Sequence, residues 1–100
     1  MSGSTLFIGS ADKNLYAVDM RTGRELWRYE TEDQVTSSPA VHEGVVYFGS
    51  VDGCVYAVEA ANGRLRWKFR SGGPITSSPV VAGDIVYIGS TDHYLYGLAA

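Results

Sequence analysis

The chain has 100 residues, of which 45% are hydrophobic and 19% charged, and its net charge is −3. This balance is typical of one small folded domain and argues against disorder. The eight Lys and Arg residues are scattered along the chain, which argues against a nucleic-acid partner because such proteins cluster basic side chains against phosphates.

Residues 1–4 form a short leader, Met-Ser-Gly-Ser, without the basic and apolar regions of a signal peptide. No apolar run approaches the length of a membrane span, so no membrane partner is predicted. We therefore expect a soluble chain that is cytoplasmic as expressed, while its native compartment is left open. Cys54 is the single cysteine, so no disulfide within the chain is expected.

Ten short strands are predicted after the leader, separated by turn signals such as Asp52-Gly53 and Asn62-Gly63. The segment 64–70 alternates charged and apolar side chains, as a half-buried strand does. Pro39 and Pro79 favour a sheet edge for their segments, because proline donates no hydrogen bond to a ladder. The strands are expected near residues 5–10, 14–20, 24–30, 35–41, 45–50, 54–60, 64–70, 75–81, 85–90 and 94–99.

The chain repeats itself every 40 residues, most visibly where Gly9-Ser10 returns as Gly49-Ser50 and Gly89-Ser90. Four antiparallel strands in each tandem period predict an all-β fold of β-propeller blades. With strands lettered A to D from the axis outward, residues 5–34 form a partial blade (B-C-D). Residues 35–74 then form a complete blade, and residues 75–100 a second partial blade (A-B-C).

The segment 17–27 resembles the tryptophan-docking motif of quinoprotein-type (PQQ-like) β-propeller repeats, Ala-x-Asp-x-x-Thr-Gly-x-x-x-Trp. The fixed positions are filled by Ala17, Asp19, Thr22, Gly23 and Trp27. The second copy keeps Ala57, Gly63 and Trp67, with Glu59 and Asn62 in place of Asp and Thr, and the third stops at Ala100 before its tryptophan. The resemblance covers about two and a half repeats, which fits a fragment of a larger ring or a designed piece of one.

The resemblance implies that Trp27 and Trp67 wedge between neighbouring blades, with each ring on the backbone of the adjacent unit. An indole suits this role because it buries a large apolar area and offers one N–H donor. We expect both tryptophans to be buried at equivalent contacts, and Asp19 and Thr22 to bond turn amides. Proteins with this repeat include quinone-dependent dehydrogenases, an outer-membrane assembly lipoprotein and sensor domains, so the repeat alone does not give a function.

Several polar residues are candidates for a functional site, but the sequence favours another explanation for each. Asp12, Asp52 and Asp92 recur in every copy and are expected to cap hairpin turns. His42 and His93 occupy different phases of the repeat, so no shared metal site is predicted. Four serines are expected in strands near the ring axis, where their hydroxyls would line a polar channel if a ring assembles: Ser37, Ser38, Ser77 and Ser78.

The sequence favours a non-catalytic repeat module with a scaffold or binding role, without catalytic residues, metal ligands or a cofactor. The alternative is a fragment of a quinone-dependent dehydrogenase, which needs unique acidic residues, a metal-ligand set and often a vicinal cysteine pair. A further alternative is a piece of a ligand-binding propeller sensor.

Incomplete terminal blades predict self-assembly into a homo-oligomer, because each exposes an unpaired edge and an apolar face. The last A strand of one chain could complete B-C-D of the next, or the last A-B-C could take D of the next. Either joint gives two whole blades per chain with one hairpin redundant, so that four chains make eight blades. Two chains supply enough strands for five blades, but the strand order at that joint does not match.

Overall fold

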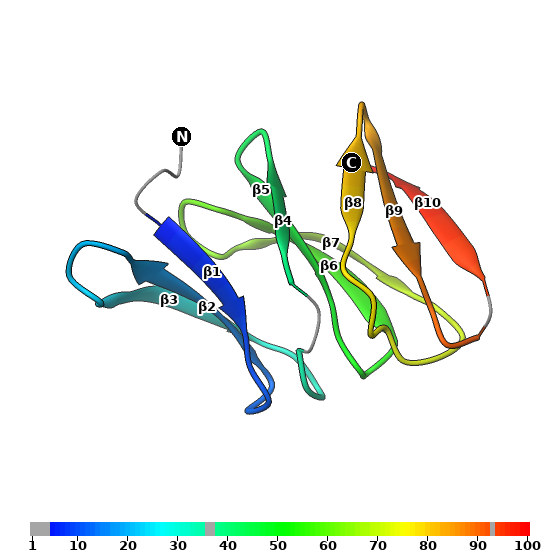
Figure 1. The fold of residues 1–100 in the computed structure, drawn as a ribbon, viewed down its shortest axis with the longest axis horizontal. Coiled ribbons are helices and arrows are strands. Elements are labelled where there is room, and N and C mark those ends of the chain that lie inside the picture. Colours follow the sequence, from blue (N-terminus) through cyan, green and yellow to red (C-terminus); the bar gives the residue numbers. More distant parts are fainter. Residues whose placement is uncertain (1–4, 36–37, 93) are drawn as a thin grey trace.

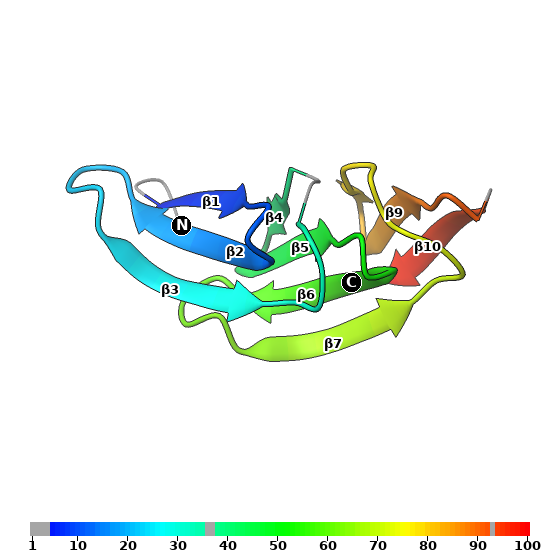
Figure 2. The same cartoon turned by 90° about the horizontal axis from the view of Figure 1, so that it is seen from below.

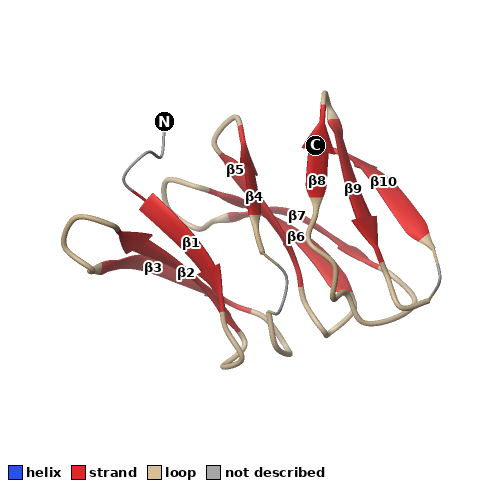
Figure 3. Cartoon of the chain, viewed as in Figure 1, coloured by secondary structure: helices blue, strands red, loops and turns tan. Residues whose placement is uncertain are grey.

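The computed structural model describes residues 5–35, 38–92 and 94–100, and these residues form ten strands and no helix (Figures 1 and 3). The predicted all-β fold is therefore confirmed. Within the described residues, no helix is long and apolar enough to cross a membrane. The strands are β1 (Thr5–Gly9), β2 (Asn14–Asp19), β3 (Glu25–Glu30), β4 (Ala40–His42), β5 (Val45–Gly49), β6 (Cys54–Glu59), β7 (Leu65–Arg70), β8 (Val80–Ala82), β9 (Ile85–Gly89) and β10 (Leu95–Ala99).

The strands form three antiparallel sheets that follow one another along the chain (Figure 1). The first sheet has the order β1-β2-β3, the middle sheet β4-β5-β6-β7 and the last sheet β10-β9-β8. Figure 2 shows β3 and β7 along one side of the molecule, away from β1 and β4. This is the arrangement of propeller blades, with a whole four-stranded blade between two three-stranded ones.

The innermost strands differ from the prediction, which placed them at 35–41 and 75–81. They begin only after Pro39 and Pro79, at Ala40 and Val80. The residues before the prolines bond elsewhere: the amide of Ile75 donates to the carbonyl of Ser50 in the preceding turn. The Ser77 hydroxyl then replaces a backbone ladder, because it contacts both the amide and the carbonyl of Gly89.

The core lies between the sheets, and the middle sheet contributes both of its faces because side chains alternate along a strand. Val46, Phe48 and Val58 pack against Phe7, Leu15 and Ala17 of the first sheet. Tyr47 and Ala57 pack against Val86, and Val55 packs against Ile88, both of the last sheet. Strands β5 and β6 are consequently buried along almost their whole length.

Candidate functional site: the docking contacts between sheets

Trp27 on β3 joins the first sheet to the middle sheet. Its indole N–H donates to the carbonyl of Ala60 at 3.0 Å. Its ring lies against the backbone of Gly63, where an added Cβ atom would come within 2.6 Å of Trp27 Cε3. Only glycine fits this contact without displacing the ring, and the phenyl ring of Phe7 supports the indole at a centroid distance of 5.8 Å.

The remaining motif residues build the turn on which an indole can lie. Asp19 Oδ1 accepts a hydrogen bond from the amide of Arg21, and Thr22 Oγ1 accepts one from the amide of Arg24. Gly23 N–H donates to the carbonyl of Asp19 at 2.7 Å, and the left-handed φ of +74° at this residue explains the glycine.

The second copy keeps the same turn although two of its residues differ. Asn62 Oδ1 accepts the amide of Arg64, and Gly63 N–H donates to the carbonyl of Glu59. Ala17 and Ala57 are fully buried and pair across the sheet with Trp27 and Trp67, respectively. In both copies the register shifts directly after this alanine.

Both tryptophans pack on clusters that join two sheets, but both are only partly buried, in contrast to the prediction. The partial burial follows from their position on β3 and β7, each of which forms one edge of its sheet. Trp67 keeps the local contact, with Tyr47 at a centroid distance of 6.0 Å. It also packs on the clusters that join the middle and last sheets, and its indole N–H has no hydrogen-bond acceptor among the described residues.

The recurring aspartates cap hairpin turns, as predicted, and two of them also hold the loop of the preceding sheet. Asp52 accepts hydrogen bonds from the amide of Cys54 at 2.9 Å, the hydroxyl of Tyr56 at 2.5 Å and the amide of Glu32 at 3.1 Å. The sequence prediction missed the bond between sheets. No side chain in the sequence marks this bond, because its donor is a backbone amide.

The third aspartate repeats this set of bonds. Asp92 accepts from the amide of Tyr94, the hydroxyl of Tyr96 and, across the sheets, the amide of Gly72 at 2.8 Å. The Tyr96 hydrogen bond holds the pKa of Asp92 below its ordinary value, because it stabilises the carboxylate. Burial, reinforced by the neighbouring Asp52 carboxylate, raises the pKa of Tyr56 above its ordinary range.

A protein-family model described as outer membrane protein assembly factor BamB matches residues 1–100. The chain belongs to this family of PQQ-like repeat proteins. A search of curated proteins found no match.

Three solved structures share the fold of this BamB-family chain. It is 18% identical to the computationally designed Ika4 protein (TM-score 0.87), covering 99% of this chain and 62% of that one. It is 19% identical to BamB from Moraxella catarrhalis (TM-score 0.84), covering 96% and 29%. It is 25% identical to a quinohemoprotein alcohol dehydrogenase from Pseudomonas putida HK5 (TM-score 0.87), covering 96% and 17%. The chain therefore spans less than two thirds of each of these proteins.

Cys54 and the recurring aspartates of this BamB-family chain are occupied by the fold itself. Cys54 is 1% exposed and burial raises the pKa of its thiol, so it faces the core rather than a cleft. Asp52 and Asp92 are fully engaged by turn amides and tyrosines. In the described part of the chain, no three His, Cys, Asp or Glu side chains are grouped so that they could bind a metal ion. The charged partner of His42 there is Glu43.

The serines predicted near the axis lie outside the strands, so their interpretation as strand residues was wrong for those described. Ser78 Oγ accepts a hydrogen bond from the amide of Ser38 at 2.9 Å, which links neighbouring repeats. Ser77 is occupied by the backbone of Gly89. Ser37 lies outside the described residues, and a polar channel remains a prediction that requires a closed ring.

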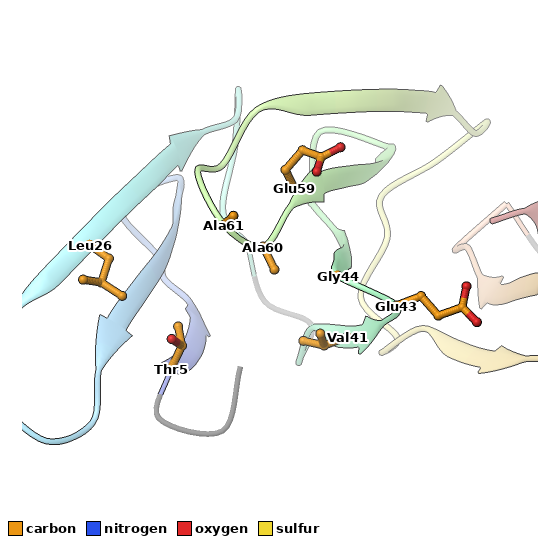
Figure 4. A pocket seen from close by; sticks show the side chains of 8 residues that line it. All are labelled: Thr5, Leu26, Val41, Glu43, Gly44, Glu59, Ala60 and Ala61. Atoms are coloured by element: carbon orange, nitrogen blue, oxygen red, sulfur yellow. The ribbon is translucent and has the colours of Figure 1, made fainter. Parts of the chain in front are cut away.

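A groove of 860 Å³ opens between the first and middle sheets (Figure 4). Its lining combines small and apolar residues with two glutamates: Thr5, Leu26, Val41, Glu43, Gly44, Glu59, Ala60 and Ala61. In Figure 4 the carboxylates of Glu43 and Glu59 lie apart and do not point toward each other. The groove therefore holds no converging acid–base pair, and Trp27 bonds to Ala60 at its wall.

Proposed function

We propose that this chain is a non-catalytic β-propeller repeat module that self-assembles into a propeller-like homo-oligomer with a scaffold or binding role. The observation that carries the proposal is that the terminal sheets expose positions which the middle sheet buries. Leu6 is 46% exposed, whereas its counterpart Val46 is fully buried; Leu95 is 73% exposed, whereas its counterpart Val55 is fully buried.

The two exposed faces are complementary, because the chain itself packs faces of these two kinds against each other at both internal junctions. On the first sheet the outward face includes Leu6 and Ile8, which are 46% and 43% exposed. On the last sheet it includes Tyr87 and Leu95, at 41% and 73%. Exposed apolar faces of this kind mark association sites, and a second copy of the chain supplies the matching face.

The contact between copies is head to tail, so a closed ring is needed to avoid a fibre. Two whole blades per chain and four chains give an eight-bladed ring. We propose this tetramer on the strand count of the repeat, with the channel-lining role of Ser38, Ser77 and Ser78 depending on the closure of the ring.

The non-catalytic character rests on how the polar residues are used. The carboxylates that recur in every repeat cap hairpin turns, and those of Asp52 and Asp92 also join sheets, which supports a structural role. The alcohol dehydrogenase with a similar fold is a much larger protein, of which this chain covers 17%. A fold shared over so small a part does not transfer an activity.

Light scattering on the chain at micromolar concentration tests the proposal. The expected mass is four times the 10.8 kDa of one chain. A double variant, Leu6→Lys with Leu95→Lys, should remain folded and lose assembly, because both side chains already lie at the surface. A folded, monomeric wild-type chain would refute self-assembly, whereas a dimer or trimer would refute the tetramer alone.

A further inference from the structure

Both internal junctions use the same hydrogen bonds between a Ser-Xaa-Asp turn and a loop of the preceding sheet. At the first junction the Ser50 hydroxyl contacts the carbonyls of Asp33 and Gln34, at 3.2 and 3.1 Å. The Val51 amide donates to the same Gln34 carbonyl at 2.8 Å, and Asp52 accepts an amide from this loop. The three residues of the turn therefore all bind the backbone of the loop.

The second junction repeats these bonds with different loop residues. The Ser90 hydroxyl lies 3.0 Å from the carbonyl oxygen of Gly73. The Thr91 amide donates to the carbonyl of Pro74 at 3.1 Å, and Asp92 accepts an amide from this loop. The two loops read Thr-Glu-Asp-Gln and Ser-Gly-Gly-Pro, so they share only a hydroxyl residue at the first position. The turn thus recognises backbone at the other three positions.

Two side chains of each bound segment also have a constant role. The hydroxyls of Thr31 and Ser71 lie 3.3 and 3.1 Å from the serine hydroxyl of the turn, and each also donates to the carbonyl two residues further on. Two residues before each hydroxyl, an aromatic ring packs on the tyrosine of the next sheet. The ring pairs are Tyr29 with Tyr56, at a centroid distance of 5.6 Å, and Phe69 with Tyr96, at 5.1 Å. The bound segment therefore has the pattern aromatic-Xaa-Ser/Thr-Xaa-Xaa-Xaa.

The β1–β2 turn of the first sheet, Ser10-Ala11-Asp12, has the same internal geometry (Figure 1). The Asp12 amide lies 3.3 Å from Ser10 Oγ, and the matching distances in the other two copies are 3.2 and 3.3 Å. The Asn14 amide donates to Asp12 Oδ1 at 3.1 Å, and the Tyr16 hydroxyl donates to Oδ2. The Tyr16 bond also holds the pKa of Asp12 below its ordinary value, so the carboxylate is charged at neutral pH.

The groups of this turn that would bind a loop have no such partner among the described residues. The Ser10 hydroxyl and the Ala11 amide have no acceptor there, and Asp12 has no donor from another sheet. Ala11 and Asp12 are exposed. Both loops of this pattern in the described chain are already bound, one by Asp52 and the other by Asp92.

We propose that Ser10-Ala11-Asp12, together with the ring of Tyr16, binds a loop of a separate protein with the pattern aromatic-Xaa-Ser/Thr-Xaa-Xaa-Xaa. Asp12 accepts the amide that follows the hydroxyl residue, Ala11 donates to the last carbonyl of the loop, and the Ser10 hydroxyl contacts the carbonyl before it. The aromatic side chain packs on Tyr16. This binding site goes beyond the proposed self-assembly and does not depend on it.

A capped synthetic peptide with the sequence of residues 69–74, Phe-Arg-Ser-Gly-Gly-Pro, is the probe. Titration into the isotope-labelled chain should shift the amide NMR signals of Ala11 and Asn14 until they saturate. We expect a dissociation constant of about 1 mM, because a short flexible peptide loses much conformational freedom on binding. A peptide with alanine in place of serine should bind about threefold to tenfold more weakly, since it lacks the hydroxyl.

Ala11 offers a matched pair of substitutions. It is the second residue of a turn in which the Lys13 amide donates to the Ser10 carbonyl at 3.3 Å, and this position accepts proline. Ala11→Pro therefore keeps the turn and removes the N–H that the peptide needs, whereas Ala11→Thr keeps the N–H. We expect Ala11→Pro to weaken peptide binding about threefold to tenfold and Ala11→Thr to leave it unchanged.

A second pair of variants tests the carboxylate. Asp12→Asn should weaken peptide binding about tenfold or more, because the amide of the peptide loses a charged acceptor. Asp84→Asn removes the same charge from the exposed β8–β9 turn and should leave binding unchanged.

Three results would overturn the proposal. The first is the absence of saturating shifts at ten times the expected dissociation constant, and the second is equal binding by Ala11→Pro and Ala11→Thr. The third is a shift of the Asn14 signal with chain concentration alone that Ala11→Pro abolishes, which would assign the site to a second copy. Light scattering on the same samples reports self-assembly separately, so a monomer that binds the peptide supports this site and refutes self-assembly.

Discussion

Replacing Gly63 by alanine should destabilise the chain much more than replacing Gly44, although the two residues share a left-handed backbone. Their φ angles are +77° and +79°. At Gly63 the new Cβ atom would lie 2.6 Å from Trp27 Cε3 and 2.7 Å from Cδ2, whereas at Gly44 it would meet nothing within 4 Å. The comparison therefore isolates the tryptophan contact from the backbone strain.

The magnitude follows from two terms. A left-handed conformation costs a residue with a Cβ atom roughly 1–2 kcal/mol, and both variants lose this amount. Forcing an extra methyl group into a packed contact costs about 1–3 kcal/mol more, and Gly63→Ala alone loses this amount. The free energy of unfolding should thus fall by about 2–5 kcal/mol for Gly63→Ala and by about 1–2 kcal/mol for Gly44→Ala.

Urea unfolding followed by circular dichroism measures both values at one chain concentration. A slope of about 1 kcal/mol per molar urea places the Gly63→Ala midpoint about 1 M or more below the Gly44→Ala midpoint. Adding Trp27→Ala to both variants should remove the difference between them. Equal midpoints in the single variants, or a difference that persists without Trp27, would refute the proposed contact between the indole and Gly63.

The remaining predictions concern two polar groups. Because the pKa of Asp92 is lowered in the folded chain, its contribution to stability is present above its ordinary pKa of 3.8 and is lost as the pH falls through the lower folded value. Thermal melting of Asp92→Asn should therefore depend less on pH in this acid range than the wild type; identical profiles would contradict this. Cys54 should react with a thiol reagent far more slowly in the native chain than in denaturant, because it is buried and its pKa is raised. Equal rates would show that Cys54 is not buried in solution.

The strands were predictable because each turn carries its own chemical signal. Asp52 caps the turn that the pair Asp52-Gly53 predicts, and Gly63 has the left-handed φ that the pair Asn62-Gly63 predicts. The start of the inner strands was not predictable from β-propensity. Pro79 and the hydroxyl of Ser77 replace the backbone ladder there, and such a replacement depends on the position of Gly89 in space.

The docking contacts were only partly predictable from the motif. The motif treats Trp27 and Trp67 as equivalent, because it specifies the residue that docks and not the surface on which it docks. The structure separates them by their acceptors: Ala60 and Gly63 stand one sheet ahead of Trp27, whereas the described residues supply no acceptor for the indole N–H of Trp67. The bond from Glu32 to Asp52 was missed for a similar reason, because its donor is a backbone amide, which any residue supplies.

The edge strands of the sheets differ in their charged residues, and this difference affects which edges can pair with strands of other molecules. Strands β3 and β7 carry charged residues at alternate positions near their ends, including Arg28, Glu30, Lys68 and Arg70, and such charges act as gatekeepers against intermolecular strand pairing. Strands β1 and β10 carry no charged residue. Unwanted cross-β pairing is therefore discouraged along β3 and β7, whereas β1 and β10 lack this protection.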